Sequence, residues 1–153
     1  MGKEIFSVNT VMENTVAVTG IRDILVETNE RHGWTIPEYV VNYEARVLAS
    51  KIDRNPWQPE PSYAERFMML RTITEALELA NTCWFTRAVF PELKLRHGVN
   101  PSYYVQLGSS CYEMVLKHND MPAVRTLHKN FEFLAECAYT AIRHYGDFRS
   151  MWD

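Results

Sequence analysis

The chain has 153 residues, a length typical of one domain, and its 46% hydrophobic and 23% charged residues are those of an ordinary soluble globular protein. Its 6 glycines and 7 prolines are too few for a collagen-like or disordered chain. Sixteen basic and nineteen acidic side chains give a net charge of −3. Because no basic stripe stands out, nucleic acid is not an expected partner, and neither is a membrane surface.

The three cysteines are widely spaced, and no two of them form a CxxC pair. Such a set is typical of small packing residues in a reducing compartment, rather than of a disulfide framework or a metal site. The first residues lack the apolar run of a signal peptide, and no stretch approaches the roughly 18 consecutive apolar residues of a membrane span. We therefore expect a cytoplasmic protein.

Glycines, prolines and capping residues divide the chain into helical segments. Capping boxes at 35–38 and 62–65 mark two helix starts, and Gly33 marks a helix end. The hydrophobic spacing between such marks predicts five helices, near residues 21–32, 36–54, 62–90, 101–118 and 121–145. Residues 5–18 fit a strand or a helix, and we favour a helix, so that residues 1–20 form either an N-terminal arm or a sixth helix.

Residues 55–61 contain three prolines and predict a stiff, extended crossover between two helices. No repeat or low-complexity tract divides the rest of the chain. We therefore expect a single helical domain over residues 1–153. Its fold class is all-α, a compact bundle of five to six helices built around the long central helix at about 62–90.

The predicted helix 62–90 carries apolar residues on two opposite sides. A helix of this kind is buried on both sides, so it is either the centre of one bundle or is shared across a homo-oligomer interface. On the predicted helix 121–145, one phenylalanine points away from the apolar stripe. The residues that we assign to an interface on these grounds are Met68, Met69, Leu79 and Phe133.

A few polar residues fall on otherwise apolar faces. Thr74 and Asn81 lie on the inner stripe of helix 62–90, with Trp84 just beyond. Buried polar groups need partners, which are either backbone carbonyls or a bound molecule. Gly108 faces inward and indicates the close approach of another helix or room for a ligand. The candidate ligand-binding residues are Thr74, Asn81, Trp84, Tyr104, Tyr112 and His128.

The sequence motifs of common enzyme classes are absent. There is no dinucleotide-binding or phosphate-binding glycine loop, no GxSxG elbow and no HExxH. No histidine stands three residues after a glutamate, as in di-metal bundles, and no two histidines lie three or four residues apart. Glu132 and Glu136 share a helix face, but that face is opposite the core stripe and is expected to be solvated. We therefore assign no catalytic residue, metal or cofactor.

Residues 90–99 read Phe-Pro-Glu-Leu-Lys-Leu-Arg-His-Gly-Val, and Tyr103, Tyr104, Gly108 and Tyr112 follow. This F-P-E…Y-Y…G…Y pattern resembles an uncharacterised bacterial all-helical family. The resemblance implies that the 92–96 turn and the tyrosines form one structural unit. It implies no activity.

Together these patterns predict a non-enzymatic cytoplasmic protein that self-associates as a homo-oligomer and has a small molecule or a protein as a candidate ligand. The alternative is a small enzyme or ligand sensor. Its aromatic-lined pocket would lie between helices 62–90, 101–118 and 121–145.

Overall fold

The computed structural model describes residues 8–52, 63–91, 102–145 and 152, and for residues 8–14 it describes the backbone alone. This part of the chain contains helices and no strand, which confirms the predicted all-α class. The helices are α1 (Val8–His32), α2 (Glu38–Ser50), α3 (Tyr63–Met68), α4 (Ile73–Val89), α5 (Ser102–Leu116), α6 (Pro122–Lys129) and α7 (Phe131–His144). None of these helices is long and apolar enough to cross a membrane.

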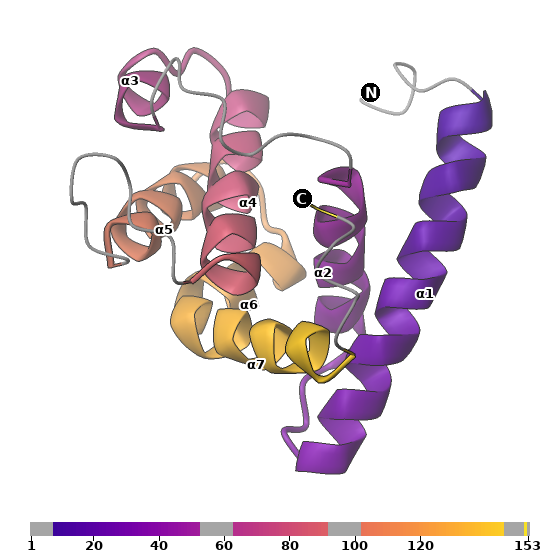
Figure 1. Cartoon of the computed structure of the whole chain (residues 1–153). Coiled ribbons are helices and arrows are strands. Elements are labelled where there is room, and N and C mark those ends of the chain that lie inside the picture. The colour runs from indigo at the N-terminus through magenta and orange to yellow at the C-terminus, as the bar shows by residue number, and fades with distance from the viewer. Residues whose placement is uncertain (1–7, 53–62, 92–101, 146–151, 153) are drawn as a thin grey trace.

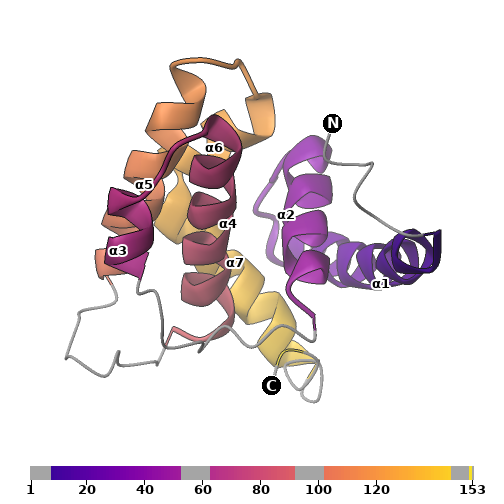
Figure 2. The same ribbon diagram turned by 90° about the horizontal axis from the view of Figure 1, so that it is seen from above.

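The helices form two groups, which Figure 2 shows side by side. α1 and α2 are packed against each other as a hairpin, and α4 is packed along α5 in the second group. α7 crosses below α4 and also reaches α1, so it connects the two groups (Figure 1). The buried side chains of both groups form one core, whose largest members are Trp84, Trp152, Tyr112 and Phe85.

α1 is one continuous helix of 25 residues, and it joins two segments that the sequence analysis treated separately. The structure thus makes residues 8–18 helical, as favoured above. α1 ends at Gly33, whose φ of +63° is the left-handed conformation that favours glycine at a helix end. The predicted helix end is confirmed.

The predicted capping box at residues 35–38 is wrong. Thr35 has a φ of +56° and its hydroxyl bonds to the carbonyl of Trp34, so it does not cap α2, which begins after Pro37. The side chain of Asn29 holds the turn instead. Its amide donates to the carbonyl of Ile36, and its carbonyl oxygen accepts from the Ile36 N–H, both at 3.1 Å. The α1–α2 turn is therefore fixed from α1.

The predicted helix 62–90 is not continuous, and the bundle has no single long central helix. It divides into α3 and α4, because a capping box starts a new helix at Thr72. The Thr72 hydroxyl accepts from the N–H of Glu75 at 3.1 Å, and the Glu75 carboxylate accepts from the N–H groups of Thr72 and Arg71. The predicted cap at residues 62–65 includes Ser62, which lies outside the described residues.

The predicted helix 121–145 is also divided, at Asn130. This residue has φ −126° and ψ 36°, outside helical values, although backbone hydrogen bonds run through it from Thr126 to Leu134. The chain therefore bends between α6 and α7. These two breaks account for the seven helices in the described residues, where five to six were predicted for the whole chain.

Gly108 marks the closest helix contact of the core. A Cβ at this position would lie 2.6 Å from Cε2 of Phe131 and 3.0 Å from Cβ of Cys83. Glycine therefore lets α5 approach both α4 and the start of α7. Of the two explanations offered by the sequence, close approach is the one that the structure supports.

Candidate functional site

Three polar features of α2 and its C-terminal end lie near the boundary between the two helix groups. Two are sets of hydrogen bonds, and one is a buried carboxyl. The first joins α2, α4 and α5 through one amide. Tyr43 and Tyr112 both donate to Oδ1 of Asn81, at 3.1 and 2.8 Å. Tyr112 is fully buried, and burial raises the pKa of both phenols, which keeps them protonated donors. The side-chain oxygen of Asn81 is therefore satisfied by two tyrosine hydroxyls.

The second contact is a buried cation. The Lys51 side chain is 9% exposed, and its Nζ donates to Oε1 of Glu78 at 2.5 Å and to the Thr82 hydroxyl at 2.8 Å. The Thr82 hydroxyl in turn donates to the backbone carbonyl of Glu78 at 2.8 Å. The Glu78 carboxylate is half exposed, so the pair joins the end of α2 to α4 at the edge of the core.

The third is a buried carboxyl without a described partner. Glu44 is 2% exposed, and its Oε2 makes no hydrogen bond to any residue that the structure describes. Burial raises the pKa of Glu44 from 4.5 to about 8, so the group is mostly protonated at neutral pH. Burial raises the pKa of the Cys137 thiol to about 12, and the nearby Glu44 carboxyl adds to this shift.

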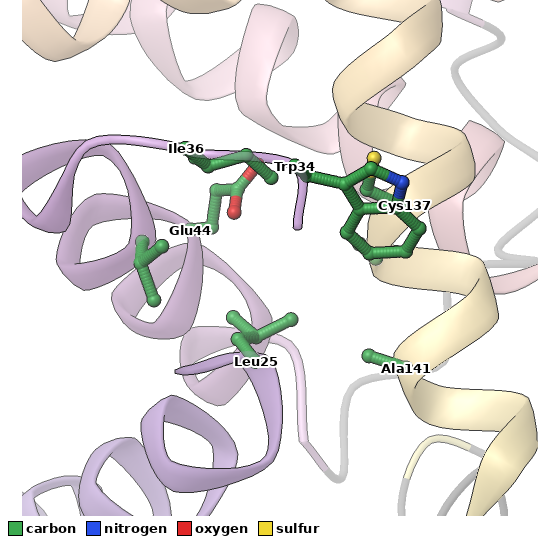
Figure 3. Close-up of a pocket in the computed structure, with 8 residues that line it drawn as sticks. Leu25, Trp34, Ile36, Glu44, Cys137 and Ala141 are labelled. Atoms are coloured by element: carbon green, nitrogen blue, oxygen red, sulfur yellow. The ribbon is translucent and has the colours of Figure 1, made fainter. Parts of the chain in front are cut away.

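Glu44 lines a cavity of about 10 Å³, between the α1–α2 hairpin and α7. Figure 3 shows Ile36 and Glu44 on the hairpin side of this space, the Trp34 ring reaching across towards Cys137, and Ala141 on α7. The remaining lining residues are apolar: Leu25, Val41 and Ala138. A cavity of this size has room for about one water molecule.

The predicted ligand-binding residues differ in their exposure and surroundings. Thr74 is exposed near the start of α4 and does not lie on its inner stripe. Trp84 and Tyr112 are fully buried, and Tyr104 packs edge-on against Tyr63, with ring centroids 5.6 Å apart. These three rings belong to the buried core.

His128 lies apart from that packed region. Its side chain is 32% exposed, and its Nε2 is 3.9 Å from Oε2 of Glu113. The structure therefore brings together only Asn81 and Tyr112 by a hydrogen bond, with Trp84 and Tyr104 in the same core.

The predicted interface residues are likewise not one surface. Met68, Met69 and Phe133 are exposed, as expected, but Leu79 is fully buried in the core. Figure 1 places α3 and α7 towards opposite ends of α4, which separates the two methionines from Phe133. Leu79 was misassigned because the predicted helix 62–90 was treated as one straight helix with two constant faces.

The surroundings of the cysteines and of the paired glutamates are typical of residues with a structural role. Cys83, Cys111 and Cys137 are buried free thiols whose pKa values burial raises, to about 11 for Cys111. Glu132 and Glu136 are exposed as predicted, yet each forms an ion pair with Arg87, at 3.5 and 3.4 Å.

Sequence reasoning missed Tyr43, Glu44 and Lys51, all of α2 or its C-terminal end. One signal was available for Glu44. It stands four residues after Val40 and four before Leu48, and therefore on the apolar stripe of a helix. An acidic residue on such a stripe indicates a buried carboxyl.

The described residues hold no group of three or more histidine, cysteine or acidic side chains that could bind a metal ion. The proposed F-P-E unit falls largely in residues 92–101, outside the described part of the chain. Compared with known proteins, the chain matches no family model, no curated protein and no solved structure, so the resemblance stated above stays a prediction.

Proposed function

We propose that the chain is a non-catalytic cytoplasmic protein that self-associates as a homodimer through the N-terminal half of α1. The observation that carries this proposal is a mismatch in length. α1 has 25 residues and is about 37 Å long, whereas α2, packed against it, has 13 residues and is about 20 Å long. Arg22 of α1 bonds to Asn42 and Glu38 near the start of α2, so part of the excess length lies at the C-terminal end of α1, while both views show the N-terminal end of α1 standing apart from the other helices (Figures 1 and 2).

The exposure of α1 side chains agrees with this geometry. Val16 is 75% exposed, and Thr19 and Gly20 are also exposed, whereas Ile21 and Leu25 are buried. Ala17 and Val18 pack against the core, so the exposed described side chains of this segment lie on the other side of the helix. An additional contact on this segment would stabilise it.

A second copy of the chain is the partner that meets this need most economically. In a two-fold dimer the same surface of each protomer contacts its equivalent. Pairing α1 with its copy would cover both exposed segments in one contact and would bury both copies of Val16.

The non-catalytic part of the proposal is supported by the state of the cysteines. The thiolate is the reactive form of cysteine, and burial raises the pKa values of Cys83, Cys111 and Cys137 well above neutral pH. These thiols are suited to packing and poorly suited to nucleophilic attack.

Light scattering coupled to size exclusion, at micromolar concentrations, tests the proposal. We expect a mass twice the 17.9 kDa of the chain for the wild type and a single-chain mass for Val16→Glu. Met68→Glu is the matched control, because it places the same charge on an exposed apolar position of α3 and should leave the dimer intact. A wild-type protein of 17.9 kDa throughout, or a dimer unaffected by Val16→Glu, would refute the α1 interface.

A further inference from the structure

We propose that the Glu44 carboxyl is a proton-dependent latch at the contact between the α1–α2 hairpin and α7. While the carboxyl keeps its proton the contact is closed, and loss of the proton opens it locally. This inference is independent of self-association, because it concerns the boundary between the two helix groups and not the exposed end of α1.

Glu44 lies where the hairpin meets α7. It lines the small cavity there together with Leu25 of α1 and with Cys137 and Ala141 of α7 (Figure 3). The residue is only 2% exposed, so its carboxyl is shielded from bulk water while the contact is closed. Moving the hairpin away from α7 would bring water to it. The protonation state of this carboxyl is therefore tied to the state of the contact.

The surroundings of Glu44 suit the neutral carboxyl and not the carboxylate. Its Oε2 makes no hydrogen bond with the residues that the structure describes, and most of the cavity lining is apolar. A carboxylate that is buried without a donor or a cation loses its hydration with little compensation, whereas a neutral carboxyl loses far less. Ionisation therefore destabilises the closed contact, and opening relieves that cost by admitting water. Burial and the missing partner thus couple the proton to the contact.

The titratable groups that interact with Glu44 carry no positive charge. Cys137 of α7 and Tyr112 of α5 both interact with its carboxyl, and burial raises the pKa of each, so both stay neutral at neutral pH. On α2 itself, Tyr43 is a protonated donor to Asn81 of α4. Burial is accordingly what raises the pKa of Glu44 to about 8, with no neighbouring charge to offset it.

The charged groups of the helices packed around α2 lie outside the cavity lining, which contains no lysine, arginine or histidine. His32 of α1 stacks on the Trp34 ring, with centroids 4.4 Å apart, without lining the cavity itself. Other charged groups of these helices are joined in pairs: Arg22–Glu38, Arg31–Glu27, Arg31–His144, Lys51–Glu78, Arg87–Glu132, Arg87–Glu136, Arg125–Asp120 and His128–Glu113. A cation that could replace the proton of Glu44 is therefore absent from the lining.

α2 is held to α4 by contacts that the loss of this proton leaves in place. Tyr43 donates to Asn81 at 3.1 Å, and Lys51 donates to Glu78 at the C-terminal end of α2. None of these four residues lines the cavity. We therefore expect the hairpin to pivot about its contacts with α4 rather than to detach, so that only the side towards α7 opens.

Ionisation and opening are linked with a definite sign. In the open form the carboxyl meets water and releases its proton near the ordinary pKa of 4.5, whereas the closed form holds the proton up to about pH 8. The ratio of open to closed molecules therefore rises by up to about tenfold per pH unit between these two values and levels off above about pH 8. The closed form is thus favoured in acid, and the open form gains weight towards pH 8.

Cys137 offers a direct probe of the opening, because its thiol lies in the cavity lining and the residue is 5% exposed. The experiment measures how fast a pyridyl disulfide labels each cysteine of the full chain from about pH 5.5 to about pH 8.5, with mass spectrometry to locate the label. Each rate is divided by that of an unstructured cysteine peptide at the same pH, which removes the ordinary effect of thiolate formation.

We expect the normalised rate at Cys137 to rise by about tenfold per pH unit up to about pH 7.5 and to level off above about pH 8. Cys83 on α4 and Cys111 on α5 are fully buried, and they should react at least about tenfold more slowly throughout, because a local opening does not reach them. Equal normalised rates at the three cysteines would indicate global unfolding and would overturn the latch.

Glu44→Gln is the decisive variant, because an amide of the same shape cannot ionise. We expect its Cys137 rate, after the same normalisation, to stay within about twofold across the pH range. Glu30→Gln, the same change at an exposed position of α1, should follow the wild type. A wild-type rate at Cys137 without pH dependence, or a pH dependence that survives in Glu44→Gln, refutes the proposal. The comparison of the three cysteines in the wild type decides the matter even if the variant does not fold.

Discussion

The ring of Phe131 lies so close to Gly108 that any Cβ at residue 108 would be 2.6 Å from the ring atom Cε2. We expect Gly108→Ala to lower the free energy of unfolding by about 1–2 kcal/mol, because overpacking of about 1–3 kcal/mol exceeds the gain of about 1 kcal/mol in helix propensity. Urea denaturation measures the difference. Gly20→Ala is the control. A Cβ at Gly20 would meet no atom within 4 Å, so alanine there should stabilise α1 by up to about 1 kcal/mol. Equal effects at the two glycines would contradict the close contact.

Removing the Asn81 amide is expected to lower the free energy of unfolding more than removing either of the tyrosine hydroxyls that donate to it. Asn81→Leu leaves the fully buried hydroxyl of Tyr112 without its partner, a loss of about 1–3 kcal/mol. Tyr43→Phe removes one half-buried hydrogen bond and should cost about 0.5–1.5 kcal/mol. Adding Tyr112→Phe to Asn81→Leu should restore part of the stability, as a chemical-denaturation cycle would show. A double variant less stable than Asn81→Leu alone would argue against this coupling.

The two partners of the Lys51–Glu78 pair should respond unequally to substitution. Glu78→Ala leaves the buried ammonium of Lys51 with Thr82 as its described partner, and we expect a loss of about 1–3 kcal/mol, less than for a fully buried pair because Glu78 is half exposed. Lys51→Met removes the buried charge, while water solvates Glu78 and Thr82 keeps its bond to the Glu78 carbonyl. That variant should lie within about 1 kcal/mol of the wild type. Thermal or urea unfolding decides the order, and a larger loss for Lys51→Met would overturn it.

Because burial raises the pKa of Glu44, we predict that the free energy of unfolding falls as the pH rises. The folded protein holds this proton up to about pH 8, whereas the unfolded chain releases it near the ordinary value of 4.5. Between these values the folded state binds more protons, so the contribution of Glu44 decreases with pH, by a total on the order of a few kcal/mol. Glu44→Gln removes this dependence and should become the more stable protein above about pH 8.

Urea denaturation at a series of pH values across this range measures the effect. Glu30→Gln should follow the wild-type profile, since its carboxyl is exposed. Parallel profiles for the wild type and Glu44→Gln would show that Glu44 titrates normally.

The sequence was sufficient for the fold class because hydrophobic spacing and helix-end residues act locally. Gly33 ends α1 as predicted, and Pro122 occupies the first turn of α6. The break between α3 and α4 also has a local signal, the capping box of Thr72 and Glu75. The apolar pattern continues across this break, however, and therefore suggested one helix. At Thr35 the capping pattern was misleading, because the side-chain bonds of Asn29 to Ile36, seven residues later, hold the turn.

The candidate site was harder to predict, because it depends on which helices meet. Asn81 was identified as a buried polar group, yet its partners Tyr43 and Tyr112 come from two other helices. Glu44 depends on the same tertiary contacts. The spacing of Val40, Glu44 and Leu48 places Glu44 on the apolar stripe of α2, but residues 38–50 do not show that α7 is the helix packed against this side of the hairpin.

Trp152 is buried in the core, and its indole N–H donates to the carbonyl of Leu48 at 2.9 Å, across 104 positions of sequence. The α2 helix therefore completes its packing only when the chain has been synthesised as far as this tryptophan. During translation the hairpin of α1 and α2 emerges long before the residue that covers it, which leaves part of its apolar surface open to chaperones or to other chains. A shortened chain that lacks Trp152 would lose this bond to Leu48 and leave the part of the core that the indole covers open to solvent.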